Sequence, residues 1–64
     1  MNVVTTVDPH GSFPITLERV DFDTAANALG LSGLARKMGE ARLTAAGEWT
    51  FLLGDAGYRM TVVA

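Results

Sequence analysis

The chain contains no cysteine and only one histidine, His10, among its 64 residues. Without cysteine there is no disulfide and no thiolate zinc site, and one imidazole cannot build a histidine metal site. We therefore expect no metal ion and no cofactor. A domain this short buries only about 60% of the surface of its unfolded chain. Good packing or oligomerisation has to supply the missing stability.

Long apolar runs are also absent. No run approaches the roughly 18 residues that a membrane-spanning helix needs, and the N-terminus does not resemble a signal peptide. We therefore expect a cytoplasmic protein without a membrane segment. The net charge is small too, because five Lys and Arg residues against seven Asp and Glu residues leave −2. This balance argues against general nucleic-acid affinity and is too small for a DNA mimic.

Three of the five aromatic residues lie near the C-terminal end, where large apolar side chains occupy every second position. The two alternating series are Trp49, Phe51 and Leu53, then Tyr58, Met60 and Val62. Period two predicts strands, and the Gly54–Gly57 segment between them predicts a hairpin. With a four-residue loop, the predicted pairs are Leu53 with Tyr58, Phe51 with Met60, and Trp49 with Val62.

A third strand is predicted just before this hairpin, from Ala41 to Thr44, with Ala45–Gly47 as a loop whose last residue is left-handed. The predicted core face of this three-stranded meander is Leu43, Trp49, Phe51, Leu53, Tyr58, Met60 and Val62. The opposite face carries Arg42, Thr44, Thr50, Leu52, Arg59, Thr61 and Val63. It mixes apolar and polar side chains, so it is the predicted partner surface, with Arg42, Thr50, Leu52, Arg59 and Val63 as candidate contacts.

The N-terminal segment predicts a second hairpin, in which Asn2–Val7 and Ser12–Glu18 are the strands. Asp8–Gly11 fits a type I turn, with Asp first, Pro second and Gly fourth. Two registers are open, pairing either Val4 with Ile15 or Val7 with Phe13. Pro14 has no N–H to donate, so the second strand lies at an edge or presents that side outward. Val20 is out of phase with the preceding apolar residues, so the strand ends or bulges near Glu18 and Arg19.

One helix is predicted between the two hairpins, over residues 24–38. Asp21 or Asp23 is the expected N-cap, and Gly39 the C-terminal stop. The apolar stripe at helical spacing is Ala28, Leu31, Leu34, Ala35 and Met38. Gly30 and Gly33 disfavour a continuous helix. The open alternative is two short helices that separate around Leu31 and Ser32.

These elements predict a single α+β domain over residues 1–64, in the order β-β-α-β-β-β. One helix covers one face of an antiparallel sheet and cannot also cover the other. His10 lies beside Asp8 and Ser12, nominally a base, an acid and a nucleophile, but all three crowd one tight turn. We interpret His10 as a solvated turn residue, assign no catalytic residue, and expect no enzyme. Asp21 and Asp23 lack the Gly and Glu of a calcium loop.

The segment Ala26–Ser32, of sequence Ala-Asn-Ala-Leu-Gly-Leu-Ser, resembles the turn of a helix-turn-helix motif. The resemblance implies a second helix from Ser32 to about Arg42, followed by a wing from Trp49 to Val63. It implies DNA contacts from Arg36, Lys37 and Arg42. The departure lies at Arg36, where the family has an apolar residue. Trp49, Phe51 and Tyr58 could in turn form a base-stacking platform, although their register favours the core.

We hypothesise a non-catalytic protein-binding module, a homodimeric inhibitor or regulator that acts on a larger protein partner through a sheet face or an edge strand. Small inhibitors carried by phages and mobile elements, including anti-CRISPR proteins, form a class of this size and plainness. The alternative is a small DNA-binding transcriptional regulator that uses segment 26–42.

Overall fold

The computed structural model describes residues 1–9 and 13–63 of the chain. Within these residues the strands are β1 (Asn2–Asp8), β2 (Ile15–Thr16), β3 (Val20–Asp21), β4 (Glu48–Leu53) and β5 (Ala56–Val63). The helices are α1 (Phe22–Leu29) and α2 (Gly33–Ala46). The predicted turn at Asp8–Gly11 and the predicted role of His10 fall outside the described residues.

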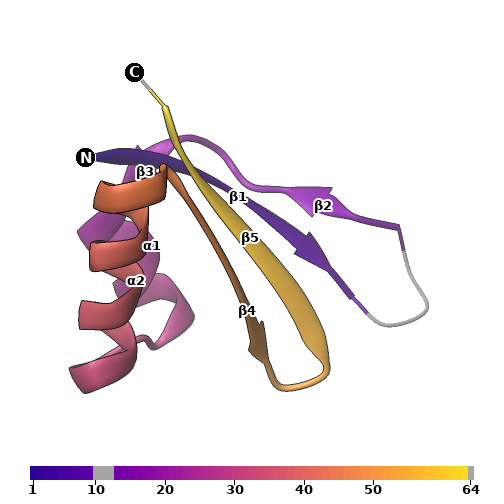
Figure 1. Ribbon diagram of the computed structural model, residues 1–64. Coiled ribbons are helices and arrows are strands. Elements are labelled where there is room, and N and C mark those ends of the chain that lie inside the picture. Colours follow the sequence, from indigo (N-terminus) through magenta and orange to yellow (C-terminus); the bar gives the residue numbers. More distant parts are fainter. Residues whose placement is uncertain (10–12, 64) are drawn as a thin grey trace.

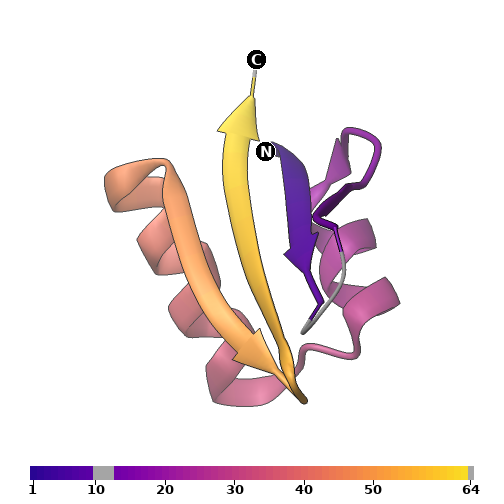
Figure 2. The same cartoon turned by 90° about the vertical axis from the view of Figure 1, so that its right-hand side faces the viewer.

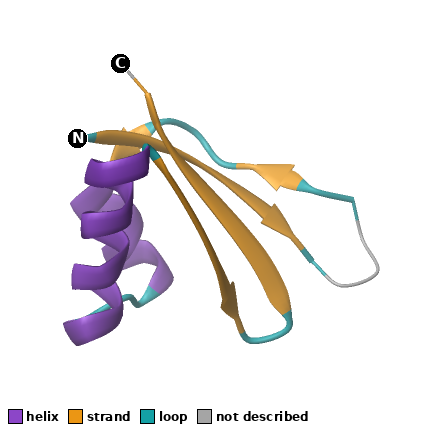
Figure 3. Ribbon diagram, viewed as in Figure 1, coloured by secondary structure: helices purple, strands orange, loops and turns teal. Residues whose placement is uncertain are grey.

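The strands form one antiparallel sheet in the order β2-β1-β5-β4. The short strand β3 also pairs with β1, at its N-terminal end, whereas β2 pairs with its C-terminal end. The first and last long strands are therefore neighbours at the centre, and both chain ends lie close together (Figure 1). Both helices lie on one side of the strands (Figure 3). The predicted α+β class and the antiparallel sheet covered on one face are confirmed, with two helices in place of one.

The N-terminal hairpin has a register that differs from both predicted alternatives, because Val7 pairs with Ile15 and Thr6 with Thr16. Further along, Val3 pairs with Val20. From Thr6 to Val3 there are three steps along β1, whereas from Thr16 to Val20 there are four steps. The one extra residue is that of a β-bulge. Of the two alternatives predicted near Glu18 and Arg19, an end of the strand or a bulge, the pairing supports the bulge. The predicted edge position is also confirmed, since β2 follows Pro14 directly and lies at the edge of the sheet.

The predicted single helix over 24–38 is wrong, and the alternative of two helices is correct. Asp21 caps α1, since its side chain accepts a hydrogen bond from the Asp23 N–H at 3.0 Å. Gly30 ends α1 in the left-handed conformation at φ 73°, where its N–H reaches the last carbonyls of the helix. This conformation favours glycine, which explains why the chain turns here. Ser32 then caps α2.

The predicted strand Ala41–Thr44 is wrong, because this segment is the C-terminal half of α2. Gly39 does not end the helix but lies inside it. The actual end is Gly47, which is left-handed as predicted (φ 74°) but acts as a helix cap rather than as the last residue of a hairpin loop. Residues 40–46 favour helix through Ala, Glu, Arg and Leu. This propensity extends over a longer stretch than the short alternation from which the strand was predicted.

The C-terminal hairpin has a two-residue loop, Gly54 and Asp55, in place of the predicted four-residue loop. Gly54 has φ 63°, the positive value that the first position of such a tight turn requires. The observed pairs are Leu53 with Ala56, Phe51 with Tyr58, and Trp49 with Met60. The register is therefore shifted by two residues from the prediction. A shift of two keeps every side chain on its predicted face.

The core lies between the helices and the sheet. Its buried members are Val3, Phe22, Ala25, Ala26, Leu31, Leu43 and Met60, with Val20, Leu29, Trp49, Phe51 and Val62 packed against them. Among the predicted core residues, Leu43 and Met60 are fully buried, although Leu43 belongs to α2, while Leu53 is 37% exposed. The three aromatic rings lie on this helix side as a stack. Their centroids are 4.0 Å apart for Trp49 and Phe51 and 5.2 Å apart for Phe51 and Tyr58.

The predicted apolar face of the helix is wrong for α2. Leu34 is 74% exposed and Met38 is 57% exposed, whereas Gly39 and Leu43 are buried. The cause is the indole of Trp49, which lies directly over the backbone of Gly39. A Cβ added at Gly39 would lie 2.6 Å from Trp49 Cε3, much closer than van der Waals contact allows. Only glycine therefore lets α2 approach the sheet this closely.

We expect Gly39→Ala to lower the free energy of unfolding by about 1–2 kcal/mol. Overpacking costs about 1–3 kcal/mol, with the upper part of the range expected against a rigid indole, and the higher helix propensity of Ala returns up to about 1 kcal/mol. Urea unfolding followed by Trp49 fluorescence measures the change. Thr44→Ala is the control, because Thr44 is exposed on the same helix. A Gly39→Ala protein as stable as the parent would contradict the indole–glycine contact.

Candidate functional site

One face of the sheet has no helix over it. Because Val3, Trp49 and Met60 point into the core, the alternate residues of β1, β5 and β4 point the other way. The register arranges them in rows across β1, β5 and β4. These rows are Asp8–Gly57–Leu52, Thr6–Arg59–Thr50 and Val4–Thr61–Glu48. Figure 2 shows the three strands in front of the helices. We call this surface the helix-free face.

Most of the predicted partner contacts lie on the helix-free face. Thr50 and Leu52 come from β4, and Arg59 and Val63 from β5. Arg42 does not lie there, nor does Thr44, because both are residues of α2. Their assignment to this face depended on the strand predicted at Ala41–Thr44, and it falls with that strand.

A cavity of about 510 Å³ opens on the helix-free face at the end near the β4–β5 turn. Gly57 is among its lining residues, separates Asp8 from Leu52 in their row, and carries no side chain. Leu52 therefore has no cross-strand side chain beside it on β5, and it is 80% exposed. The lining residues are Thr6, Asp8, Pro14, Thr50, Phe51, Leu52, Gly57, Tyr58 and Arg59.

Arg59 and Glu48 form an ion pair on the helix-free face. Arg59 Nε lies 3.6 Å from Glu48 Oε1, and both side chains are more than half exposed. Such an exposed pair contributes little to stability. It does leave one acidic and one basic group at the surface, available to a charged partner.

The backbone of β4 forms an open edge, because β4 pairs with β5 alone among the described strands. The Val62 N–H donates to the Gly47 carbonyl at 2.9 Å, so Gly47 and Val62 form a hydrogen-bonded pair. Antiparallel pairing then directs the backbone groups of every second residue toward β5. Those of Glu48, Thr50 and Leu52 point to the open edge. The side chains of these residues lie on the helix-free face.

The opposite edge of the sheet is protected. There β2 has only two residues, Pro14 precedes it, and a bulge follows it. Short strands, proline and bulges are the devices that prevent unwanted pairing of sheet edges. The six residues of β4 carry no proline or lysine and pair with β5 without a bulge. The two edges therefore differ in their capacity to accept another strand.

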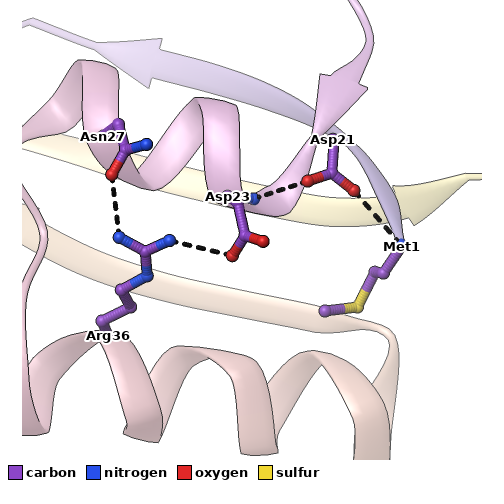
Figure 4. A network of polar contacts seen from close by, with 5 residues as sticks. All are labelled: Met1, Asp21, Asp23, Asn27 and Arg36. Atoms are coloured by element: carbon purple, nitrogen blue, oxygen red, sulfur yellow. Dashed lines mark hydrogen bonds and ion pairs between the residues drawn. The ribbon is translucent and has the colours of Figure 1, made fainter.

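The cations of the DNA-binding alternative do not form one surface. Arg36 reaches back to α1, where its Nη1 donates to Asn27 Oδ1 at 2.9 Å and its Nη2 to Asp23 Oδ1 at 2.8 Å (Figure 4). Its guanidinium therefore fills the place where the helix-turn-helix pattern has an apolar residue. Lys37 and Arg42 are five residues apart on α2, which places them about 140° apart around the helix.

The chain matches no protein-family model, no curated protein and no solved structure. In the part of the chain that the structure describes, no helix is long and apolar enough to cross a membrane. Nor do three or more His, Cys, Asp or Glu residues cluster there as metal ligands would.

The open edge of β4 was not predicted from the sequence, because the predicted meander placed another strand, Ala41–Thr44, beside it. Two signals were available in the sequence. The first is Gly57, because a register that pairs it with Leu52 leaves that leucine without a cross-strand side chain. The helical propensity of residues 40–46 was the other signal, since it removes the competing strand.

Arg36→Ala should lower the free energy of unfolding by about 1 kcal/mol, because it removes the two hydrogen bonds that join α2 to α1. The Arg36 side chain is 29% exposed and that of Asp23 is 69% exposed, so we use the upper part of the range for surface pairs. Denaturant unfolding measures the effect. Lys37→Ala, at the exposed neighbouring position, should change stability by less than about 0.5 kcal/mol. Equal effects of the two substitutions would contradict the assigned role of Arg36.

Proposed function

We propose that the chain is a non-catalytic protein-binding module, a homodimeric inhibitor or regulator that acts on a larger protein partner. The observation that carries this proposal is the open edge of β4. It combines outward backbone groups with an exposed leucine and an adjoining cavity. Main-chain pairing at a sheet edge supplies affinity, and alternate side chains supply specificity.

The chemistry of β4 indicates the kind of partner. An extended segment of the partner would pair with the backbone of Glu48, Thr50 and Leu52 and continue the sheet. Its alternate side chains would then lie on the helix-free face, where opposite-charge and apolar cross-strand pairs are favourable. An apolar residue fits opposite Leu52, and a basic residue four positions away fits opposite Glu48. We infer that the bound segment has this pattern.

The DNA-binding alternative has less support. Two of its three cations would remain if Arg36 stays with Asp23 and Asn27, and these two are on different sides of α2. DNA affinity requires several cations that face the phosphates together. We therefore keep DNA binding as an outcome of the test below rather than as a second proposal.

The first test is capture of a protein partner from nuclease-treated lysate by the tagged chain, followed by mass spectrometry. Leu52→Lys should reduce capture at least tenfold, because a charge at the open edge opposes strand pairing and removes the apolar contact. Thr50→Pro should act likewise, since it removes an outward N–H and leaves the ladder with β5 intact.

Ile15→Lys is the matched control, because it places the same charge at an aliphatic residue, 54% exposed, on the opposite and protected edge of the sheet. It should retain capture of the same protein. Undiminished capture by both β4 variants would overturn the proposal. Recovery that appears only when nuclease is omitted, and that is lost when Arg36, Lys37 and Arg42 are all replaced by Ala, would favour the DNA-binding alternative instead.

A further inference from the structure

The outer face of α2 carries an apolar stripe that no part of the described chain covers. Leu34 and Met38 are one turn apart and 74% and 57% exposed, and Ala41 and Ala45 continue the same line. The steps of four, three and four residues are those of a helix–helix contact seam. The stripe lies on the side of α2 opposite Gly39 and Leu43, which face the core. We call it the α2 stripe.

We propose that the α2 stripe is the contact surface of the homodimer, in which α2 packs antiparallel against α2 of a second copy. This inference builds on the homodimer in the proposed function and names its interface. In the antiparallel arrangement Leu34 of one copy lies against Ala45 of the other, and Met38 against Ala41. Each layer then joins a large side chain to a small one, so the two helices keep a constant separation.

A parallel arrangement fits less well. It would place Leu34 against Leu34 and Met38 against Met38 at one end, and alanine against alanine at the other. The helices would then have to splay, leaving unfilled space between the alanines. Packing without voids favours the antiparallel pair.

The charges beside the α2 stripe select the same orientation. Lys37 and Thr44 flank it on one side, and Ala35 and Arg42 on the other. The twofold axis of an antiparallel pair brings each flank against the same flank of the second copy. Lys37 then faces Thr44, and Arg42 faces Ala35. A parallel pair would bring opposite flanks together and set Lys37 against Arg42, two like charges.

The proposed dimer leaves the helix-free face open, because α2 lies behind the strands (Figure 2) and the α2 stripe is on the side of α2 away from its buried residues. Each dimer would therefore present two copies of the β4 edge. One 14-residue helix per copy makes a small contact. It falls below the standard interface of about 1,200–2,000 Å², so we expect a dissociation constant in the micromolar range.

Sedimentation equilibrium from about 1 to about 500 micromolar tests the inference. The parent chain should pass from monomer to dimer over this range. Leu34→Lys should weaken the dimer at least about a hundredfold, because each dimer loses two buried leucines. Leu52→Lys should leave the association unchanged. A parent chain that stays monomeric throughout, or a dimer lost in Leu52→Lys rather than in Leu34→Lys, would overturn the inference.

Ala35 offers a second pair of variants that tests the orientation without disturbing the stripe. Ala35→Glu should tighten the dimer severalfold, because each new carboxylate faces Arg42 of the second copy, and Ala35→Lys should weaken it by a similar factor. Equal association of these two variants would contradict the antiparallel pairing. Far-UV circular dichroism checks that all variants fold. A parent chain that dimerises but captures no protein partner would count against partner binding in the proposed function and leave the dimer inference standing.

Discussion

The contact between the Trp49 indole and the backbone of Gly39 decides which face of α2 meets the sheet. An indole is wide and rigid, and any side chain at position 39 would collide with it. The helix therefore turns its glycine inward, with Leu43 one turn later reaching the core. Leu34 and Met38, two of the three large apolar residues of α2, are directed outward as a consequence.

Because of this contact, the side chains that favour helix formation in α2 do not determine which face of the helix is buried. Hydrophobic periodicity assumes that the largest side chains of a helix face the core, and it identified the wrong stripe here. The sheet already supplies the bulk through Trp49, Phe51 and Met60, so the helix contributes the smallest residue available. In a core with seven buried apolar residues among those that the structure describes, one aromatic ring is enough to reverse the expected orientation.

The sequence was informative where local chemistry decides the structure. The Asp21 cap, the bulge after Leu17, the edge position of β2 and the α+β class all follow from residue types at neighbouring positions. The face of the sheet on which each hairpin side chain lies was also predicted correctly despite the wrong register, because a shift of two residues does not change it. The misassigned strand at Ala41–Thr44 has a different origin. Four alternating residues fit a strand and a helix equally, and only the length of the helical stretch resolves them.

The candidate site was harder to predict because an edge is a property of the whole sheet. Thr50 and Leu52 are predicted as partner contacts from the face they share, and the structure brings them together with Arg59. Whether their backbone groups point outward depends on which pairs are hydrogen-bonded, and the Val62–Gly47 bond beyond the hairpin establishes this.

Edge protection and surface apolarity together suggest why the chain would use two surfaces rather than one. A chain this short has little core and gains stability from each additional apolar contact. The α2 stripe offers large against small side chains and no opposed like charges, as self-association requires. The β4 edge instead has a single acidic residue, a leucine beside a glycine, and unpaired backbone, which suit an extended segment of different sequence. The division between the surfaces therefore follows from Trp49, since the helix face that it excludes from the core becomes the one available to a second copy.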